Sequence, residues 1–526
     1  MTSGYDTIVV GAGHNSLTTA AYLAKAGENI LVLEKNPWIG GGVVTHELTE
    51  PGFLHDRHST AHVFIQGNPM ITQDELGLIS DFGLKYIYPD ISFATIFDDH
   101  TSLITYQDVD RTCKSIAQFS EKDADSYRKF TEMSKRILPL LTSSLYVPPA
   151  PQGTFFAMLD QSPEGRDIMA AMQKSVYDLV TEWFEHEKVI IHLLKFTSEA
   201  LAAPEEKGTG ITLYLMPGFV HTYPCGLPEG GSGELSNALV RCIEHHGGTV
   251  KTDQNVVKII QEGGKAVGVR LESGEEFKAK NAVVGSIHPH LLDQYVSGLD
   301  DRVMKNAKGI QPASFSAMNT HYALNEAPLF HAGQEAAQAL LLELVPSNLD
   351  DFRRTFDNYR YGMTADATSI VAAIHTNHDP SRAPLDKATL YMYSFMPFAL
   401  KDGGSAMWDE VKEKVADKLL TDFRKYSYNM TSDNIISRYV DSPLDMLRSS
   451  DSFQGGDVHG TGPFLHQFGG HRPTPELSQF AVPGVENFYL AGPFMHPGGG
   501  VFGGGRATAI KILDDFGKDF DDVILG

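Results

Sequence analysis

Two kinds of residue in this sequence could do chemistry: glycines spaced for close approach to a phosphate, and histidines that titrate near neutral pH. The first glycine motif, G-A-G-H-N-S at 11–16, follows the β-branched run T-I-V-V. Gly11 allows a tight turn, and Gly13 lets the backbone approach a pyrophosphate. A helix expected to follow would direct its free N–H groups and positive dipole end at the phosphates. The motif therefore predicts a dinucleotide site.

Two further residues bear on which dinucleotide is bound. Ser16 stands where the third glycine of G-x-G-x-x-G normally allows close packing of helix on strand, and serine is small enough to replace it. A second strand, expected at 29–34, ends in Glu34. This is near the spacing of about 20 residues expected for a carboxylate that bonds a ribose 2′-OH. An acid here disfavours NADP and leaves FAD and NAD open.

A second glycine cluster follows directly and favours FAD. The stretch V-L-E-K-N-P-W-I-G-G-G at 32–42 resembles the E-[RK]-x4-G-G continuation of the large FAD family that contains amine oxidases and phytoene desaturases. In that family the acid binds the adenosine ribose and the paired glycines adjoin the pyrophosphate. The resemblance therefore implies FAD, bound by Glu34, Lys35, Gly40 and Gly41.

Two later stretches strengthen this resemblance. Residues 225–286 resemble the return of the chain into the family's cofactor domain, and 485–513 resemble the segment that closes over the flavin ring. In the latter, a strand at 488–490 precedes a glycine-dense loop, and the helix expected near 505–513 begins with free N–H groups suited to the negative charge of a reduced flavin. In these stretches and the first motif, the residues expected to hold FAD are Gly11, Gly13, His14, Asn15, Ser16, Val256, Gly492, His496, Gly499, Gly500 and Val501.

Matching phrases such as G-A-G-H-N, T-E-W-F-E-H-E and H-P-G-G-G-V are scattered over nearly the whole chain. They resemble the phytoene desaturase-like FAD oxidoreductases that are often named pyridine nucleotide-disulfide oxidoreductase domain proteins. The chain departs from this family at G-G-G-R-A-T-A, residues 503–509, which is one residue shorter than the family's G-x-x-G-R-N-A-A. Because Cys113, Cys225 and Cys242 form no CxxC pair, disulfide reductase chemistry is set aside.

Histidines concentrate in the segments expected near the flavin ring, and a neutral imidazole can accept a proton. A structural role is the commoner one for any single histidine. The proposed catalytic candidates are His496, His58 and His459, chosen from a set that also contains His55, His62, His466 and His471.

Two other patterns near these histidines need an interpretation. Asp56 and Arg57 are adjacent, and could form a local ion pair at the surface or hold ribityl and phosphate oxygens of the cofactor. No H-E-x-x-H or similar carboxylate and histidine spacing accompanies the histidines. We therefore predict no metal site.

An α/β fold has to bring these distant stretches together. We expect a Rossmann-type FAD-binding domain assembled from 1–67, 222–290 and 455–526, and an α+β substrate-binding domain assembled from 68–221 and 291–454. The latter should contain a mixed sheet and a helical lid region. Its expected elements are strands at 313–324, 368–376 and 388–398, and helices over 115–200 with a proline-rich break at 146–153.

The expected strand L-Y-M-Y-S-F-M-P-F places Tyr391, Tyr393 and Phe395 on one face and Met392 and Met396 on the other. The aromatic face could line an apolar pocket, or these side chains could simply fill the core.

Composition excludes several classes of function. The net charge of −23 opposes binding to nucleic acid and to anionic membrane surfaces. No stretch approaches the about 20 apolar residues of a membrane span. Because the first strand begins within ten residues, no room is left for a signal peptide. We expect a cytoplasmic protein, with peripheral membrane association left open.

Together these features predict an FAD-dependent oxidoreductase that transfers a hydride from a hydrophobic or aromatic small molecule to flavin N5, forming a C=C, C=N or C=O bond. Oxygen or another electron acceptor would reoxidise the flavin. Two alternatives stay open: a flavin amine oxidase of the same fold, and a flavin-free binding module that resembles prenyl-protein chaperones. The sequence names neither the substrate nor the oligomeric state.

Overall fold

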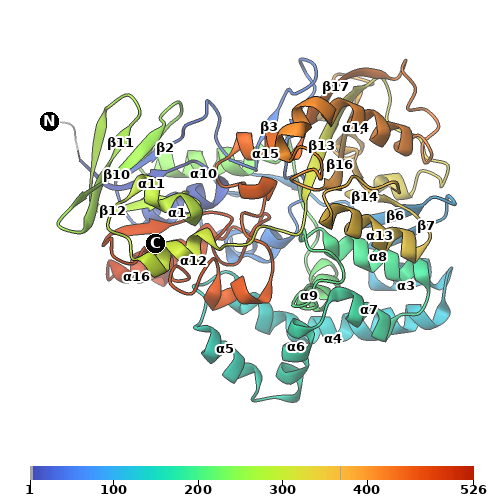
Figure 1. The fold of residues 1–526 in the computed structure, drawn as a ribbon, viewed down its shortest axis with the longest axis horizontal. Helices are drawn as coiled ribbons and strands as arrows, with labels where there is room; N and C mark the ends of the chain where they lie inside the picture. Colours follow the sequence, from blue (N-terminus) through green and yellow to red (C-terminus); the bar gives the residue numbers. More distant parts are fainter. Residues whose placement is uncertain (1–3, 368, 526) are drawn as a thin grey trace.

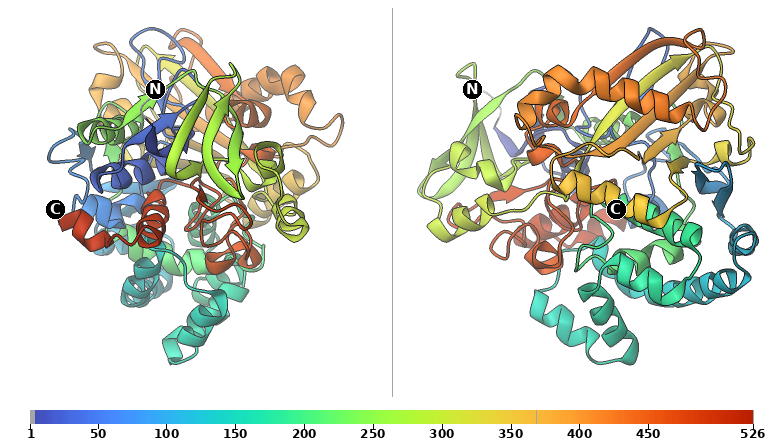
Figure 2. Two further views of the ribbon diagram at one scale, coloured as in Figure 1. Left: turned by 90° about the vertical axis from the view of Figure 1, so that its left-hand side faces the viewer. Right: turned by 45° about the vertical axis from the view of Figure 1, so that its right-hand side comes forward.

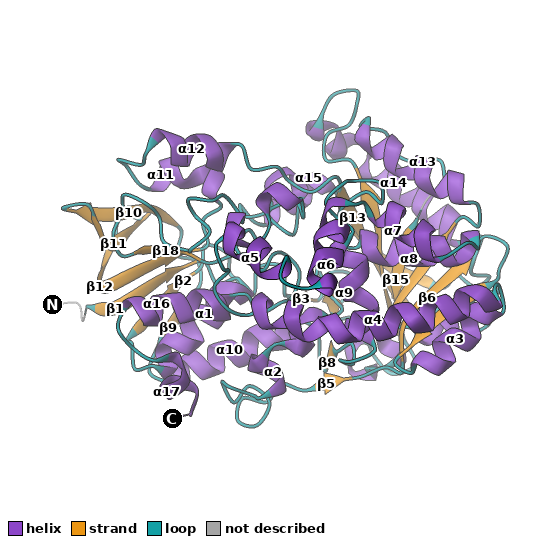
Figure 3. Ribbon diagram, turned by 90° about the horizontal axis from the view of Figure 1, so that it is seen from below, coloured by secondary structure: helices purple, strands orange, loops and turns teal. Residues whose placement is uncertain are grey.

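The computed structural model, which describes residues 4–367 and 369–525, is organised around two seven-stranded sheets (Figures 1 and 3). The first sheet has the order β10-β11-β12-β1-β2-β9, with β18 also paired to β12. Strands β9, β2, β1, β12 and β18 run parallel, and β10 and β11 extend the sheet as an antiparallel hairpin. The bounds are β1 Tyr5–Val10, β2 Ile30–Leu33, β9 Thr249–Lys251, β10 Val256–Glu262, β11 Lys265–Leu271, β12 Glu276–Gly285 and β18 Phe488–Leu490.

The parallel strands form because their residues are apolar on both faces. All four residues of β2 are buried, as expected for a strand covered on both sides. Complete burial of each such side chain contributes about 1.5–3 kcal/mol. On one side lie α1 (His14–Lys25), α10 (Gly233–His245) and α16 (Gly505–Asp515), whose apolar residues share a core with β1 and β2.

Helix α1 is almost wholly buried, since every residue from His14 to Ala24 is inaccessible or nearly so. Its close helix contact is made at Gly505, where an added Cβ would lie 1.9 Å from the backbone oxygen of Asn15. The hydroxyl of Thr19 donates to the oxygen of Gly505 at 3.0 Å. Helix α16 thus packs closely on α1 through Gly505, a glycine near the other end of the chain. Ser16, which replaces the third glycine of the motif, is buried in α1.

The second sheet has the order β17-β13-β16-β15-β14-β6-β7 and is antiparallel except for the pair β14 and β6. Helix α14 covers one face, and α8 and α13 pack on the opposite side with the helical region. The bounds are β6 Ile91–Phe97, β7 Ser102–Tyr106, β13 Ser316–Leu324, β14 Leu341–Val345, β15 Ile370–Ala373, β16 Ala388–Met396, β17 Ile435–Asp441, α13 Leu349–Arg360 and α14 Trp408–Phe423.

The helical region lies below the second sheet in Figure 1. The predicted break is confirmed, because α4 ends at Leu145 and α5 begins at Gln152. Turned views show α5 and α6 standing out from the rest of the molecule (Figure 2). The bounds are α3 Val109–Ala117, α4 Glu121–Leu145, α5 Gln152–Leu159, α6 Pro163–Gln173, α7 Val176–Trp183, α8 Glu187–Ser198 and α9 Ile211–Val220.

The remaining elements are short and connect these layers. Two short antiparallel sheets of two strands each pair β3 with β4 and β5 with β8. The bounds are β3 Thr45–His46, β4 His55–Asp56, β5 Tyr86–Ile87, β8 Leu227–Pro228, α2 Pro69–Thr72, α11 Leu292–Tyr295, α12 Asp301–Lys308, α15 Pro443–Ser449 and α17 Phe520–Leu525.

Every strand of the first sheet falls in the segments predicted for the cofactor domain, and every strand of the second in those predicted for the substrate domain. The domain boundaries themselves stay a prediction. Of the predicted strand at 368–376, residues 370–373 form β15, and residue 368 lies outside the described residues. Within the described part of the chain, no helix is both long and apolar enough to cross a membrane.

Of the two interpretations of Asp56 and Arg57, the local ion pair is wrong. Asp56 is completely buried and accepts from Arg382 Nη1 at 2.7 Å, whereas Arg57 Nε donates to Asp441 at 2.8 Å. Neighbouring side chains on an extended segment point to opposite sides, so the two cannot easily face each other. Neither residue lines the cavity described below. The second interpretation, that these two side chains hold cofactor oxygens, therefore has no support either.

Candidate active site

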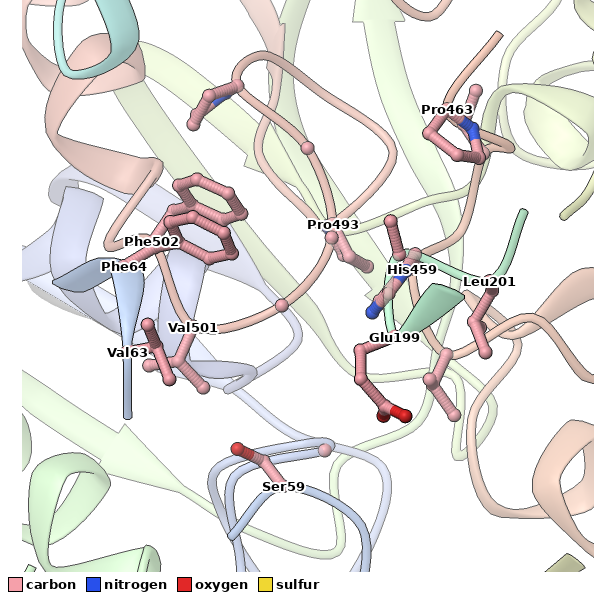
Figure 4. Close-up of a pocket in the computed structure, with 18 of the residues that line it drawn as sticks. Ser59, Val63, Phe64, Glu199, Leu201, His459, Pro463, Pro493, Val501 and Phe502 are labelled. Carbon is pink, nitrogen blue, oxygen red and sulfur yellow. The ribbon is translucent and has the colours of Figure 1, made fainter. Parts of the chain in front are cut away.

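A cavity of about 460 Å³ lies where segments of the two sheets meet (Figure 4). One part of its wall is main chain: the turn before α1, the second glycine cluster and the glycine-rich loop near the C-terminus. Another part consists of aromatic and aliphatic side chains from β6, α8, β14 and β16. The volume is in the range of small-molecule and cofactor sites.

Most of the residues predicted to bind the cofactor line this cavity. They come from segments almost 500 positions apart in the sequence and are brought together by the pairing of β1 with β12 and of β12 with β18. Those on the cavity wall are Gly13, His14, Asn15, Ser16, Gly41, Gly492, His496, Gly499, Gly500 and Val501.

Glu34, Gly11 and Gly40 lie behind the wall and shape it. The carboxylate of Glu34 accepts from the backbone N–H of Ala12 at 2.7 Å and of Asn36 at 2.9 Å. Gly40 has φ +103° and donates its N–H to the oxygen of Ala12 at 2.7 Å. Glu34 thus fixes the glycine turn through the backbone, a role that sequence reasoning did not assign to it.

Lys35 and Val256, also predicted to bind the cofactor, lie outside this cavity. The ammonium of Lys35 is 2.6 Å from the carboxylate of Asp451 in a solvent-accessible pair. Val256 begins β10 and is buried in the apolar core on the far side of the first sheet. Their roles toward FAD stay predictions.

The chain's own atoms at the glycine turn fit a phosphate-bearing nucleotide. Helix α1 has no side-chain cap. Its first N–H group, that of His14, donates to the backbone oxygen of Gly40 at 3.3 Å, and the N–H groups that follow in the first turn need another partner. The atoms His14 Nε2, Asn15 Oδ1 and Ser16 Oγ are buried without a hydrogen-bond partner. A Cβ added to Gly13 would meet nothing within 4 Å. Buried polar atoms are normally paired, so this wall is complementary to a polar ligand that approaches the backbone closely.

His14 also connects the two glycine-rich segments. Its imidazole hydrogen-bonds to the backbone of Gly500, and burial lowers its pKa to about 4. The ring is therefore neutral at pH 7.

The three catalytic candidates all line the cavity. His496 Nε2 lies 2.9 Å from the backbone oxygen of Ser144, and its Nδ1 is buried without a partner. Burial lowers the pKa of His496 and of His58 to about 4, and also lowers that of His459. Each ring is neutral near pH 7 and has the capacity to accept a proton.

The other four histidines of the predicted set do not line the cavity. His62 is fully satisfied, with Nδ1 2.9 Å from the Tyr86 hydroxyl and Nε2 2.7 Å from the Ser232 hydroxyl. His55 Nε2 lies 2.8 Å from the hydroxyl of Thr49, and its Nδ1 is buried without a partner.

The aromatic face of β16 is divided between cavity and core. Tyr391 and Tyr393 line the cavity, and the Tyr391 hydroxyl donates to the backbone oxygen of His58 at 3.0 Å. Phe395, on the same face, packs with Phe315 in the helical core, where the ring centroids are 4.4 Å apart. Both of the interpretations given to this strand therefore hold, each for part of it.

Sequence reasoning missed two features of the wall. Glu199 lines the cavity beside a fully buried lysine, Lys195. Arg472 is buried and donates to the backbone oxygens of Met495 and Pro493, which fixes the loop before the glycines. The sequence does carry a signal for the first feature: Lys195 and Glu199 lie four residues apart in the largely apolar stretch V-I-I-H-L-L-K-F-T-S-E-A.

A family model described as flavin containing amine oxidoreductase matches residues 17–511. The chain belongs to this family. As a member of this family it is an FAD-dependent oxidoreductase that acts on a small-molecule substrate with an electron acceptor. The predicted family resemblance and cofactor are thereby confirmed.

Curated relatives cover nearly the whole of this family member. Pyridine nucleotide-disulfide oxidoreductase domain-containing protein 2 of Rattus norvegicus is 28% identical, over 97% of the chain and 93% of the relative. One of the subunits of limonene dehydrogenase from Castellaniella defragrans is 26% identical, over 97% and 95%. Phytoene desaturase (lycopene-forming) of Pantoea ananas is 24% identical, over 97% and 99%.

Solved structures confirm the predicted fold class. An oxidoreductase from Methanosarcina mazei superposes with a TM-score of 0.60 at 16% identity, covering 97% of this chain and 100% of that one. Together, these comparisons lend no support to the flavin-free binding module.

Proposed function

We propose that this FAD-dependent oxidoreductase removes a hydride from an apolar or aromatic small molecule, with oxygen or another acceptor reoxidising the flavin. The observation that carries the proposal is the two-part wall of the cavity. One part offers main chain and unpartnered polar atoms, and the other offers the side chains of Phe93, Phe196, Leu341, Tyr391 and Tyr393.

The first part of the wall contains the residues that would hold the cofactor. Gly13 and Gly41 leave the backbone bare, the N-terminus of α1 offers free N–H groups, and Gly499 and Gly500 provide a second bare segment. When bound, FAD supplies the hydride acceptor that no amino-acid side chain provides.

The second part of the wall would bind the substrate, and an aromatic pair elsewhere on the wall would help to exclude water. Phe64 and Phe502 stack with a centroid distance of 4.4 Å and an interplanar angle of 4°, and both line the cavity (Figure 4). Such a pair adds about 0.5–1.5 kcal/mol beyond its buried area. It therefore forms a firm apolar boundary between a segment near residue 64 and the C-terminal glycine loop.

The neutral histidines on the wall would accept a proton where the oxidised group loses one. His496 is the candidate on the glycine-rich loop itself, and His58 and His459 are the candidates from other segments. These roles rest on position and on protonation state.

Two relatives support an apolar substrate. The limonene dehydrogenase and the phytoene desaturase are named for hydrocarbon substrates, and each relative aligns with 97% of this chain. The predominantly apolar second part of the cavity is consistent with a substrate of that class.

A flavin amine oxidase is the second candidate, and Glu199 is the observation that favours it. Among the described residues that line the cavity, Glu199 alone carries a carboxyl group. An ionised carboxylate at that place would attract an ammonium group.

Absorption spectroscopy of the purified protein tests the proposal. We expect flavin bands that bleach anaerobically on addition of a terpene, a carotenoid or an aromatic alcohol. Bleaching by amines alone, with stoichiometric hydrogen peroxide in air, would establish the amine oxidase instead. A folded protein that binds no flavin would contradict both.

A further inference from the structure

Arg472 is a buried cation at the wall of the cavity. It follows the short 3₁₀ turn Gly469–His471, is 3% exposed and lines the cavity. Its guanidinium lies against the glycine-rich loop near the C-terminus, because a Cβ on Gly498 would be 3.3 Å from Arg472 Cζ. Arg472 therefore places a charge beside the loop that is expected to hold the flavin ring.

Main-chain oxygens from two segments hold the guanidinium in place. Its Nε donates to the oxygen of Met495 at 3.1 Å, and its Nη2 donates to that of Pro493 at 2.9 Å. Nη2 also donates to the oxygens of Thr461 and His459 at 3.2 and 3.3 Å. His459 and Pro493 are both labelled on the cavity wall in Figure 4. These bonds fix the position of the charge, but a carbonyl oxygen carries no full negative charge to balance it.

No carboxylate of the described residues forms an ion pair with Arg472. Asp457 is the acid whose charge acts on it, but the two oxygens of Asp457 accept from the backbone N–H groups of His459 and Ala313 at 2.7 and 2.8 Å. The bonds that the described residues form with Arg472 also leave out Nη1. A buried charge without a direct partner is costly. Arg472 is therefore suited to a negatively charged group inside the cavity.

The guanidinium keeps its charge at pH 7, whereas the histidines near it do not carry one. Burial lowers the pKa of Arg472 to about 10, which is still above neutral pH. Burial and the charge of Arg472 together lower the pKa of His288 and His496 to about 4, and they also lower that of His459. These three rings are therefore uncharged near pH 7.

Arg472 is thus the cation of the cavity. Of the described residues that line the cavity, Arg472 is the one lysine or arginine, and Glu199 is the one acid. Glu199 pairs with the buried Lys195, which also contacts Glu343. The acid on the wall therefore has its own cation, and the charge of Arg472 is left for a ligand.

Hydride transfer creates a negative charge in such a site. The oxidised flavin ring is uncharged, and a hydride brings it two electrons and one proton, so the reduced ring carries one negative charge. The substrate that gives up the hydride then loses a proton, which a neutral histidine of the wall accepts. When the electron acceptor takes the two electrons and the proton is released, the ring is uncharged again.

We propose that Arg472 is the electrostatic partner of the reduced flavin and raises its reduction potential. Because main-chain bonds already hold the guanidinium, it stabilises the anionic reduced ring without rearrangement, while the uncharged oxidised ring gains little. This inference rests on the proposed function, since it takes the glycine-rich loop to lie against the ring of bound FAD. Oxidation of the substrate is the half-reaction that Arg472 favours.

Two variants separate the charge of Arg472 from its hydrogen bonds. R472K keeps a positive charge but loses the planar, forked set of donors. R472Q loses the charge and keeps an amide group that donates to main-chain oxygens. If Arg472 only holds the two segments together, the two variants should behave alike. If its charge acts on the flavin, they should differ.

Redox titration of the purified holoenzyme against dyes of known potential measures the effect. At a given potential, R472Q should lower the ratio of reduced to oxidised flavin at least about tenfold, which is about 30 mV for a two-electron couple. R472K should stay within about threefold of the wild-type ratio, since the charge is kept. R448M is the control for net charge: it removes an exposed cation paired with Asp409, which solvent and salt screen, so the ratio should not change.

The protonation of the reduced flavin gives a second readout. Arg472 favours the anionic ring, so the wild-type reduced flavin should take up its proton at a lower pH than free reduced FAD. In R472Q this protonation should move to higher pH by at least about one unit, the same tenfold effect. The absorption spectrum of dithionite-reduced protein at successive pH values measures it.

Equal potentials in the wild type and R472Q would overturn the proposal. An equal loss in R472K and R472Q would also overturn it, because the hydrogen bonds and not the charge would then be responsible. If R472Q held no flavin, the wild-type enzyme would still decide: a reduced flavin protonated at the same pH as free reduced FAD, or at a higher pH, would contradict the role of Arg472.

A folded wild-type protein that holds no flavin would remove the proposed function. A holoenzyme that oxidises its substrate, with a potential that does not depend on Arg472, would remove this inference alone. The two failures are therefore distinguishable.

Discussion

Gly13 and Gly11 differ in why they are glycines. Gly11 has φ +88°, and a Cβ there would lie 2.9 Å from that of Ser286, so the fold itself requires glycine. Gly13 has φ −66° and ψ 153°, and its Cβ would meet no atom within 4 Å. Any residue could adopt that backbone. Gly13 lines the cavity, and we propose that its missing side chain leaves the space that a phosphate of the cofactor needs.

The variant Gly13→Ala should therefore fold normally and bind FAD poorly. We expect a free energy of unfolding within about 0.5 kcal/mol of the wild-type value. The dissociation constant of FAD should rise about tenfold or more, since each 1.4 kcal/mol is a factor of ten. Thermal unfolding and fluorescence titration of flavin-free protein measure the two quantities.

Gly153→Ala is the matched control, because a Cβ there also meets nothing within 4 Å and the residue does not line the cavity. Equal FAD affinity in both variants would place the cofactor somewhere other than at Gly13.

Glu34 should matter for folding as well as for the cofactor. Its two carboxylate oxygens accept from the backbone of Ala12 and Asn36. Glu34→Gln leaves one of these N–H groups facing an amide nitrogen, and an unsatisfied buried donor costs about 1–3 kcal/mol. Urea denaturation of flavin-free protein measures this loss.

Lys35→Ala serves as the comparison for Glu34→Gln, since it removes only an exposed ion pair worth less than about 1 kcal/mol. If Glu34→Gln were as stable as Lys35→Ala, the role of Glu34 would lie with the bound ligand alone.

At the scale of elements, Asp56 connects segments that belong to the two predicted domains. Its carboxylate accepts from Arg382 at 2.7 Å, from the backbone N–H of Ser232 before α10 at 2.7 Å, and from the Thr45 hydroxyl of β3 at 2.7 Å. Arg382 has no exposed surface and also donates to the oxygen of Pro228 at 2.9 Å. One buried ion pair thus connects segments from both predicted domains.

Removing Arg382 should destabilise the whole chain. Arg382→Met leaves the carboxylate of Asp56 buried with no cation, which costs about 3–5 kcal/mol. Arg448→Met is the control, because the pair of Arg448 with Asp409 is solvent-exposed and is worth less than about 1 kcal/mol. Equal urea midpoints for the two variants would show that this buried ion pair is not a stabilising element.

At the scale of the whole molecule, the chain buries many neutral histidines. Burial lowers the pKa of His14, His58, His288 and His496 to about 4 and that of His192 to about 3. In the unfolded chain these rings titrate near 6.5. Between these values the unfolded state binds more protons than the folded state, so stability falls as the pH is lowered from about 6.5 toward 4.

The free energy of unfolding should therefore drop steeply over this range in urea titrations at successive pH values. Each such histidine adds up to about 1.4 kcal/mol per pH unit. Glu199 and Glu343 act in the opposite sense: burial raises the pKa of each carboxyl, that of Glu199 to about 8, so their contribution to stability is lost as the pH rises. Two carboxyls do not offset five histidines.

His192→Asn provides the control for this slope. His192 is bonded on both ring nitrogens by the hydroxyls of Thr95 and Thr105, at 2.7 and 2.8 Å. Replacing His192 should reduce the pH dependence of the free energy of unfolding by the contribution of one histidine, up to about 1.4 kcal/mol per pH unit. A stability that is constant from pH 6.5 to 4 would contradict the neutral state of the buried rings.

The sequence by itself determined the local backbone geometry of the segments predicted to bind FAD. A β-branched run followed by glycines and small residues can do little other than form a buried strand, a tight turn and a helix, because backbone sterics act between neighbouring residues. The strands and turns around Gly11 and near 488–490 were therefore predictable, as were the break after α4 and the paired aromatics of β16.

Only the tertiary structure decided which distant residues meet. Nothing in the spacing of Glu199 and Glu343 says that both would reach one lysine, or that Asp56 would turn from Arg57 to Arg382. Those contacts depend on how the second sheet packs on the helices and on the first sheet. Burial then sets which carboxyls and imidazoles keep their protons, because desolvation acts through the whole surrounding volume and not along the chain.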